Sequence, residues 1–249
     1  MRILISNDDG FMREGIRTLE SVLIKHGHDV YLVAPHTEQS AKSHAMTVVG
    51  EITVWKHDDH HYSLEGTPAD CVIYSLKSGL LPIVPDVVIG GINHGYNLST
   101  DTIYSGTCGV ARQGAMYGFP SIAISTMYDE NGDYDFVSPS EYLASNLEYY
   151  CDALKGAEAF LNLHFPPHWN GKVEKASLGV IHYNDQFSIK EKGNKISIRT
   201  TGCDLSMVPS PESVGYEMDS TITDRGSASI TFVEITPGYD RERMNKLKV

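Results

Sequence analysis

One stretch of this sequence, residues 2–10, reads Arg2-Ile3-Leu4-Ile5-Ser6-Asn7-Asp8-Asp9-Gly10. A short apolar run of this kind is typical of a buried strand. Two adjacent carboxylates and a glycine follow the run, at the place where open α/β sheets bind their ligands, past the carboxyl end of a strand. The stretch therefore predicts an α/β fold with a metal or phosphate site beside its first strand.

Strand and helix patterns alternate through the first half of the chain. Apolar residues at helical spacing occupy residues 15–26, and a second strand-like run, residues 28–34, ends at Pro35. Thr67 and Pro68 are typical of a helix start, and that helix is expected to reach Lys77. Strands are expected at 87–89 and 121–125, with a polar loop at 90–104 and a helix at 107–117 between them. This order predicts a three-layer, doubly wound, mostly parallel sheet of the Rossmann-like type.

The remaining segments have weaker patterns. Residues 47–55 and 61–64 predict a strand pair beside the main sheet, residues 138–155 a helix, and residues 160–164 a strand. Residues 187–192 and 195–200 predict a β-hairpin around Gly193-Asn194. Residues 206–223 are expected to form a loop, and residues 228–235 a late strand. We expect one domain over 1–249, with a core at 1–165 and a hairpin and oligomerisation segment at 166–249.

The composition limits the classes of function. A formal net charge of −12 repels a nucleic-acid backbone, so no nucleic-acid polymer is expected as a partner. We identify neither a signal-peptide pattern nor an apolar run of membrane-span length, so we expect no membrane partner and a cytoplasmic location. The cysteines form no CxxC pair, which favours reduced thiols over a disulfide framework.

Polar residues follow three of the predicted strands. Asp8 and Asp9 follow the first, Ser40 lies after the second, and Asn93 follows residues 87–89. If these strands are parallel neighbours, the side chains converge at one edge of the sheet. Their oxygen atoms suit one hard divalent cation per subunit, Mg²⁺ or Mn²⁺. The alternative for Asp-Asp-Gly alone is a turn that caps the next helix.

A second motif directly precedes the helix expected at 107–117. Ser105, Gly106 and Thr107 offer backbone N–H groups and hydroxyls to a phosphate at the positive end of that helix, although an ordinary N-cap is equally consistent. Asn97, in the preceding polar loop, is a further candidate for substrate binding. Tyr104 is expected to pack into the core, with stacking on a base as the alternative.

His44 and His94 flank the predicted site. Either imidazole titrates near neutral pH and is a candidate donor of a proton to the leaving alkoxide. In a chain with 11 histidines, a solvated loop position is the commoner role for any one of them.

Five motifs, in their order and spacing, resemble the SurE family of stationary-phase survival protein nucleotidases. They are residues 3–10, Val33-Ala34-Pro35 leading to Ser40, residues 66–72, residues 85–97, and residues 104–107. The resemblance implies a divalent-metal-dependent nucleotidase that acts on nucleoside 5′- and often 3′-monophosphates and assembles as a homodimer or homotetramer. It implies metal ligands at Asp8, Asp9, Ser40 and Asn93, and phosphate binding at Ser105, Gly106 and Thr107.

The predicted mechanism is direct attack of a metal-activated water on the phosphate, with Asp8 and Asp9 as the catalytic pair and Asp8 as the proton acceptor. His94 departs from the arginine or small residue usual in the family, which leaves the substrate preference open. Three alternatives remain: a non-catalytic nucleotide or metal sensor, a broad-specificity phosphatase or exopolyphosphatase, and a structural assembly protein.

Overall fold

The computed structural model describes residues 1–210 and 215–236. The strands are β1 (Arg2–Ser6), β2 (Asp29–Pro35), β3 (Val54–Lys56), β4 (His61–Leu64), β5 (Val87–His94), β6 (Ser121–Thr126), β7 (Ala159–Phe165), β8 (Val173–Lys175), β9 (Gly179–Lys192), β10 (Lys195–Pro209) and β11 (Ala228–Glu234). The helices are α1 (Glu14–Lys25), α2 (Pro68–Lys77), α3 (Asp101–Tyr104), α4 (Gly106–Met116), α5 (Val137–Leu154) and α6 (Asp219–Asp224).

A single large sheet forms the centre of the molecule. Within the described ranges it has nine strands in the order β3-β4-β2-β1-β5-β6-β7-β11-β8. β1 pairs in parallel with both β2 and β5, and β5, β6 and β7 continue the parallel set. Among the described strands of this sheet, antiparallel pairs occur only near its two ends, at β3 with β4 and at β7 with β11. The predicted mostly parallel sheet is confirmed.

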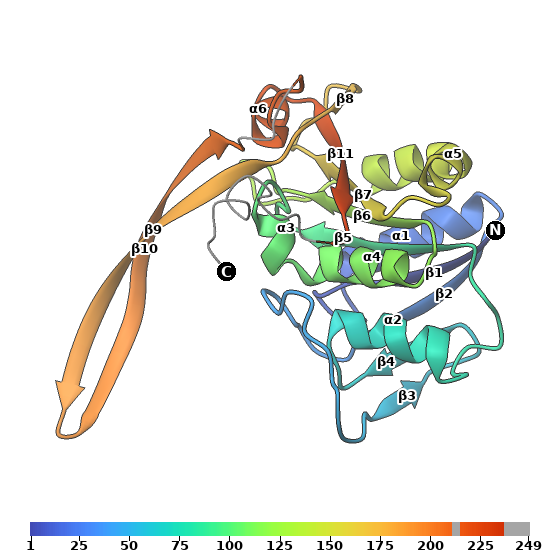
Figure 1. Cartoon of the computed structure of the whole chain (residues 1–249), viewed down its shortest axis with the longest axis horizontal. Helices are drawn as coiled ribbons and strands as arrows, with labels where there is room; N and C mark the ends of the chain where they lie inside the picture. Colours follow the sequence, from blue (N-terminus) through green and yellow to red (C-terminus); the bar gives the residue numbers. More distant parts are fainter. Residues whose placement is uncertain (211–214, 237–249) are drawn as a thin grey trace, which may run out of the picture.

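Helices cover both faces of this sheet, which makes the three predicted layers (Figure 1). Ile3 and Ile5 of β1 are fully buried in the cluster that contains the apolar side chains of α1 and α5. Leu4 points the other way, into the cluster formed with Cys71 of α2 and Val110 of α4. Because both faces are covered, the three central residues of the strand are all apolar, and burial of each of these side chains contributes about 1.5–3 kcal/mol.

The start of α2 follows from its sequence. The Thr67 hydroxyl accepts a hydrogen bond from the Asp70 backbone N–H at 3.2 Å, and the Asp70 carboxylate accepts one from the Thr67 backbone N–H at 2.9 Å. This reciprocal capping box satisfies two of the backbone donors that a helix start leaves open. Pro68, the first residue of the helix, has no backbone N–H and so adds no unpaired donor. The predicted helix from Thr67 to Lys77 is confirmed.

The strand pair expected beside the main sheet belongs to that sheet. β4 pairs in parallel with β2, and β3 forms the edge by pairing antiparallel with β4. Only Val54–Lys56 is strand, so the expectation of a strand from residue 47 is wrong. Residues 48 and 49 are exposed valines, which have strand-like composition and no partner strand in the described sheet.

The expected loop at residues 90–104 is wrong in part, because β5 continues to His94 and α3 occupies Asp101–Tyr104. Glycine usually weakens a strand, yet Gly90 lies within β5 because α4 passes directly over it. A Cβ atom at Gly90 would lie 2.4 Å from the Thr107 carbonyl oxygen. The glycine is therefore required by the close approach of strand and helix, which no local pattern indicates.

The predicted hairpin is confirmed and is longer than expected, since β9 and β10 pair from Gly179 with Pro209 out to Lys192 with Lys195. It projects away from the body of the molecule (Figure 1). The expected loop at 206–223 is wrong in part: β10 runs to Pro209 and α6 occupies Asp219–Asp224, while residues 211–214 lie outside the described residues. Partner strand β9 stabilises the Ser- and Pro-containing end of β10.

β11 pairs with β7, so the main sheet crosses the predicted boundary at residue 165. The division into a core and an oligomerisation segment stays a prediction. Among the described residues, no helix has both the length and the apolar character needed to cross a bilayer.

Candidate active site

A cavity of about 590 Å³ lies at the carboxyl ends of β1 and β5. This volume is within the usual range for small-molecule sites. It is lined by Asp8, Ser40, Ala41, Asn93, His94, Gly95, Tyr96, Asn97, Asp101, Tyr104, Ser105, Tyr183 and Asp185. Three of the four predicted metal ligands therefore line one cavity, as does Ser105 of the predicted phosphate motif.

Asp8 is buried at the start of α4. Its Oδ1 accepts a hydrogen bond from the Thr107 hydroxyl at 2.6 Å, and its Oδ2 accepts one from the Gly106 backbone N–H at 3.0 Å. Burial raises the pKa of Asp8 to about 6, against the opposing effect of the Thr107 hydrogen bond. The two hydrogen bonds place the Asp8 carboxylate at the N-terminal end of α4, where the helix dipole favours negative charge.

Gly106 permits this contact because it has no side chain. A Cβ atom at Gly106 would lie 2.7 Å from Asp8 Cβ and 2.8 Å from Pro68 Cγ. Both distances are shorter than real contacts of a Cβ atom allow.

Asp9 lies beside the cavity and is not among its lining residues. Its Oδ2 accepts a hydrogen bond from the His94 backbone N–H at 3.2 Å and is 3.0 Å from His94 Nδ1. The chain leaves the strand at Gly10, whose φ is +112°. The local turn is closed by Asn7, whose amide exchanges hydrogen bonds with the Gly10 backbone at 3.2 and 3.1 Å.

The turn-and-cap alternative for the aspartates is therefore not what the structure contains. Asn7 supplies the turn, and α1 begins at Glu14 with Arg13 at its N-cap and no side-chain cap. Both aspartate side chains instead contact groups far away in the sequence, Thr107 and His94.

Asn93 and Asn97 lie on the cavity wall next to Asp8. The Thr107 hydroxyl, which bonds Asp8, is also 3.5 Å from Asn93 Oδ1. Asn93 Nδ2 donates to the Gly95 carbonyl at 3.1 Å and is 3.5 Å from Asn97 Oδ1. Asn97 Nδ2 is buried without a hydrogen-bond partner among the described residues. A buried donor without a protein partner is a group that an ordered water or a bound ion can satisfy.

Ser40 is exposed and its hydroxyl donates to Glu38 Oε1 at 2.9 Å. It lines the same cavity as Asp8 and Asn93. The carboxylate, amide and hydroxyl oxygens of these residues are hard donors, which fit Mg²⁺ or Mn²⁺ better than a soft metal. A cation there would also offset the cost of burying the Asp8 charge.

The predicted phosphate motif is divided between two roles. Ser105 is the N-cap of α4, where its hydroxyl accepts from the Cys108 N–H at 3.0 Å, and it also lines the cavity. The Gly106 N–H and the Thr107 hydroxyl are bonded to Asp8. The N-cap alternative is thus correct for Ser105, without removing it from the cavity wall.

The two candidate histidines lie in different places. His94 lines the cavity, and its ring packs edge-on against Phe136 at 4.6 Å between centroids. His44 is not among the lining residues: its Nε2 is 2.9 Å from Gln113 Oε1, and burial lowers its pKa. The structure therefore brings His94, and not His44, to the cavity.

Several lining residues escaped the sequence prediction. Tyr104 has 56% of its surface exposed and lines the cavity, so the expectation that it packs into the core is wrong. Tyr183 and Asp185 come from the part of β9 that precedes the hairpin strand predicted at 187–192. Asp101 comes from α3, inside the segment expected to be loop.

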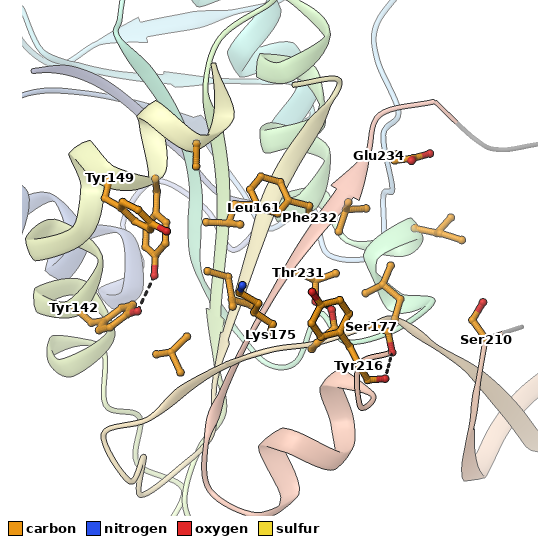
Figure 2. A pocket seen from close by; sticks show the side chains of 18 of the residues that line it. Tyr142, Tyr149, Leu161, Lys175, Ser177, Ser210, Tyr216, Thr231, Phe232 and Glu234 are labelled. Atoms are coloured by element: carbon orange, nitrogen blue, oxygen red, sulfur yellow. Dashed lines mark hydrogen bonds between the residues drawn. The ribbon is translucent and has the colours of Figure 1, made fainter. Parts of the chain in front are cut away.

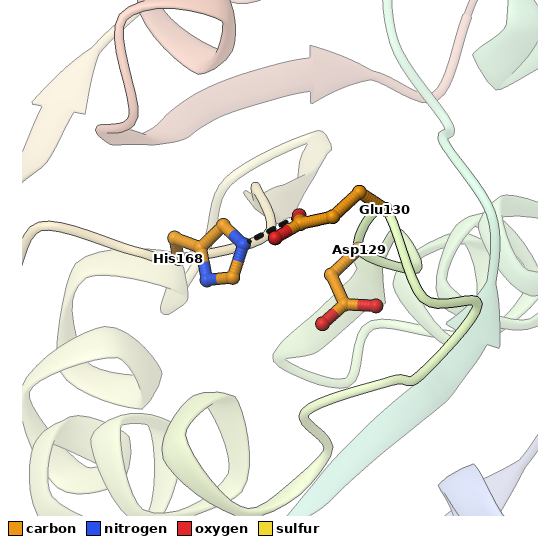
Figure 3. Close-up of side chains that lie close together, drawn as sticks. All are labelled: Asp129, Glu130 and His168. Atoms are coloured by element: carbon orange, nitrogen blue, oxygen red, sulfur yellow. Dashed lines mark hydrogen bonds and ion pairs between the residues drawn. The ribbon is translucent and has the colours of Figure 1, made fainter.

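A second group of metal-ligating side chains lies in the loops after β6 and β7 (Figure 3). One ligand atom each of Asp129, Glu130 and His168 lies within 4.8 Å of the others, so these residues could hold a metal ion. His168 Nε2 is 2.8 Å from Glu130 Oε2, and both residues are exposed. The Asp129 carboxylate also accepts from the backbone N–H groups of Asn131 and Asp133, so it has a structural role in its own loop.

The described chain also has a larger cavity, of about 850 Å³, between α5 and the β11 side of the sheet (Figure 2). Tyrosine and aliphatic side chains dominate its lining, and its charged members are Lys175 and Glu234. The Tyr142 and Tyr150 hydroxyls, 2.6 Å apart, bond to each other. This lining offers an apolar surface and lacks the converging carboxylate and amide oxygens of the smaller cavity.

Comparison with known proteins identifies the family and the fold. A family model described as Survival protein SurE matches residues 3–186. A relative named 5′-nucleotidase SurE from Leptospira interrogans serovar copenhageni is 37% identical over 193 residues, 76% of each chain. Another of that name, from Clostridium botulinum, is 38% identical over 205 residues, 79% of this chain and 81% of the relative.

The crystal structure of SurE protein from Aquifex aeolicus has the same fold. It matches with a TM-score of 0.78 and 25% sequence identity, over 99% of this chain and 97% of that one. The predicted fold class and enzyme class are thus confirmed, since relatives from several organisms carry the name of an enzyme. By the match of the family model, by its relatives and by its fold, this chain belongs to the SurE family.

Proposed function

We propose that this chain hydrolyses nucleoside 5′-monophosphates, and also 3′-monophosphates, to nucleoside and phosphate. One observation carries the proposal: oxygen donors from three separate strand ends, Asp8, Ser40 and Asn93, line one cavity together with Ser105. Names of relatives support the 5′-nucleotide as substrate. A phosphate monoester placed among these groups meets the Ser105 hydroxyl at the N-cap of α4 and hard oxygen ligands.

The proposal includes one divalent cation per subunit, Mg²⁺ or Mn²⁺, held by Asp8, Asp9, Ser40 and Asn93. When bound, such an ion lowers the pKa of a water molecule and offsets charge on the phosphoryl oxygens. Asp8 accepts the proton of the attacking water, and Ser105 and Asn97 orient the phosphate for in-line attack. His94 donates a proton to the leaving alkoxide, with its Nδ1 held by Asp9 at 3.0 Å.

We further propose that the chain acts in the cytoplasm as a homodimer or homotetramer through the segment 166–249, with β9 and β10 as its projecting arm. One face of this hairpin carries the exposed apolar side chains of Phe187, Ile189 and Ile198, which a second copy would cover.

The test is phosphate release from AMP and from 3′-AMP with Mn²⁺ or Mg²⁺, with and without a chelator. Asp8→Asn should lower turnover by a factor on the order of 10² or more while the thermal melting curve stays cooperative. Asp129→Asn is the matched control, because it removes a carboxylate from the exposed second group and should leave turnover at the wild-type level. Turnover of Asp8→Asn near wild type would refute the site.

Two other outcomes discriminate between classes of function. Tight nucleotide binding without phosphate release identifies a sensor. If Asp129→Asn loses its sensitivity to the chelator while Asp8→Asn keeps it, the metal is bound by Asp129, Glu130 and His168. That result contradicts the proposal.

A further inference from the structure

The active-site cavity has a second wall, built from α3 and the base of the hairpin. This wall consists of Asp101, Tyr104, Tyr183 and Asp185. Tyr104 has 56% and Tyr183 has 44% of its surface exposed, so both rings are open to contact. The lining of the same cavity also holds the polar groups of Asp8, Asn93 and Ser105.

Hydrogen bonds fix the hairpin base against the segment that leads into α3. The Gly179 N–H donates to the Ser99 hydroxyl at 3.0 Å, and the Ile181 N–H donates to the Thr100 hydroxyl at 3.0 Å. The next residue on the same face of β9, Tyr183, donates its hydroxyl to Asp101 Oδ1. Alternate residues of β9 thus bond to three consecutive residues of this segment, which holds the Tyr183 ring in place.

Ser99 is itself held from a third element. The Asp219 carboxylate, buried at the start of α6, accepts from the Ser99 N–H at 2.6 Å and from its hydroxyl at 2.7 Å. Hydrogen bonds among β9, the segment before α3, and α6 therefore hold this wall in place. These elements are far apart in the sequence.

The charge on this wall restricts what it can contact. Asp101 and Asp185 are carboxylates, and the described lining of the cavity includes no lysine or arginine. A second phosphate group placed there would meet like charge in a partly desolvated site. A neutral group with hydrogen-bond donors, such as a ribose or a nucleobase, meets acceptors and two aromatic faces instead.

We propose that α3 and the hairpin base form the nucleoside end of the active site, in which Tyr104 and Tyr183 contact the base and Asp101 and Asp185 discriminate against di- and polyphosphates. The inference rests on the proposed nucleotidase function and deepens it, because it names the residues that recognise the nucleoside and that exclude longer phosphate chains. Tyr183 is thereby a specificity-determining residue that the hairpin contributes.

The test compares kcat/KM for AMP, ADP and glycerol 2-phosphate, and measures adenosine binding by calorimetry. Tyr183→Ala should lower the ratio of kcat/KM for AMP to that for glycerol 2-phosphate by about 10-fold, mostly through KM, and should weaken adenosine binding by a similar factor. Tyr183→Phe keeps the ring and should keep the ratio within about 3-fold of wild type. Asp185→Asn should raise the rate with ADP relative to AMP.

The matched control is Tyr149→Ala, which removes an exposed tyrosine ring from α5, outside the active-site cavity. It should leave the AMP ratio and adenosine binding at wild-type values. If Tyr183→Ala lowers kcat/KM equally for AMP and glycerol 2-phosphate, the proposed nucleoside end is wrong. It is also wrong if the wild-type protein has a kcat/KM ratio near one for these two substrates. Neither result contradicts the phosphatase function. Adenosine binding that depends on Tyr183 without phosphate release supports the nucleoside end and overturns the proposed hydrolysis.

Discussion

The Thr107 hydroxyl donates to Asp8 Oδ1 at 2.6 Å, across 99 positions of sequence. This hydrogen bond joins the end of the first strand to the first turn of α4. It fixes the orientation of a carboxylate that has both oxygens bonded within the protein. The positions of the donors that surround Asp8 should therefore matter as much as the carboxylate itself.

Thr107→Val tests this orientation, because valine keeps the shape of threonine and removes its donor. We expect a free energy of unfolding lower by about 1–3 kcal/mol, since a buried carboxylate loses a charge-assisted hydrogen bond. Turnover should fall by about 10-fold or more as Asp8 loses its fixed orientation. Urea unfolding and steady-state kinetics measure the two effects.

The control for that variant is Thr231→Val in β11, where a buried hydroxyl outside the active-site cavity donates to the Ala176 carbonyl at 3.2 Å. It should lower stability by a comparable amount and leave the chemical step unchanged. If both variants lose turnover equally, the effect of Thr107→Val is a general loss of stability and the orienting role is wrong.

Gly106→Ala tests the close approach of α4 to Asp8. The added Cβ would lie 2.9 Å from Asp8 Oδ2, so either the helix start or the carboxylate must move. We expect destabilisation by about 1–3 kcal/mol and loss of most turnover. Gly202→Ala in the hairpin is the control, because its Cβ would meet Gln186 Oε1 at an ordinary 3.5 Å. Wild-type kinetics in Gly106→Ala would show that Asp8 tolerates displacement.

The sequence predicts the convergence of Asp8 and Asn93 because their proximity depends only on the order and direction of the strands. Parallel neighbours end at one edge, and β1 and β5 are such neighbours. Tyr183 and Asp185 are different, because their place on the cavity wall depends on the bond from Gly179 to Ser99, 80 positions apart. No periodicity or motif in the hairpin records that contact.

The mistaken loop at residues 90–104 has a related cause. Glycine disfavours strand structure, so Gly90 argues locally against a strand. A glycine is needed at this position of β5 because the Thr107 carbonyl of α4 leaves no room for a Cβ atom. Local propensity is overridden here by tertiary packing, and such positions lie beside the site because strand and helix must approach closely there. The loop prediction for residues 90–104 therefore fails in a segment that lines the active site.

Asp219→Ala tests whether the α6 anchor of Ser99 supports substrate binding. Loss of the carboxylate leaves the Ser99 N–H and hydroxyl, both buried, without their acceptor, which should cost about 2–4 kcal/mol of stability. Because Ser99 also accepts from Gly179 at the hairpin base, KM for AMP should rise more than kcat falls. A fall in kcat with unchanged KM would contradict this link between α6 and the cavity wall.

His164 makes the stability of this fold depend on pH. Burial lowers its pKa to about 3 from 6.5, because the ring is fully enclosed between β6 and its own strand β7 with Nδ1 at 2.7 Å from Ser125 Oγ. Below the unfolded pKa the unfolded chain binds a proton that the folded chain excludes, so stability falls as the pH falls through that range. Between about pH 7.5 and pH 5.5 the loss from this group should be about 1.4 kcal/mol.

His164→Phe keeps a ring of similar size against Tyr96 and removes the titrating group. Its unfolding free energy, measured by urea denaturation at both pH values, should lose about 1.4 kcal/mol less than wild type on acidification, whatever its absolute stability. His168→Gln is the control, because Glu130 raises the pKa of that exposed histidine and its contribution has the opposite sign. A wild-type pH dependence in His164→Phe would mean that the buried ring accepts a proton in the folded state, against its lack of a partner at Nε2 among the described residues.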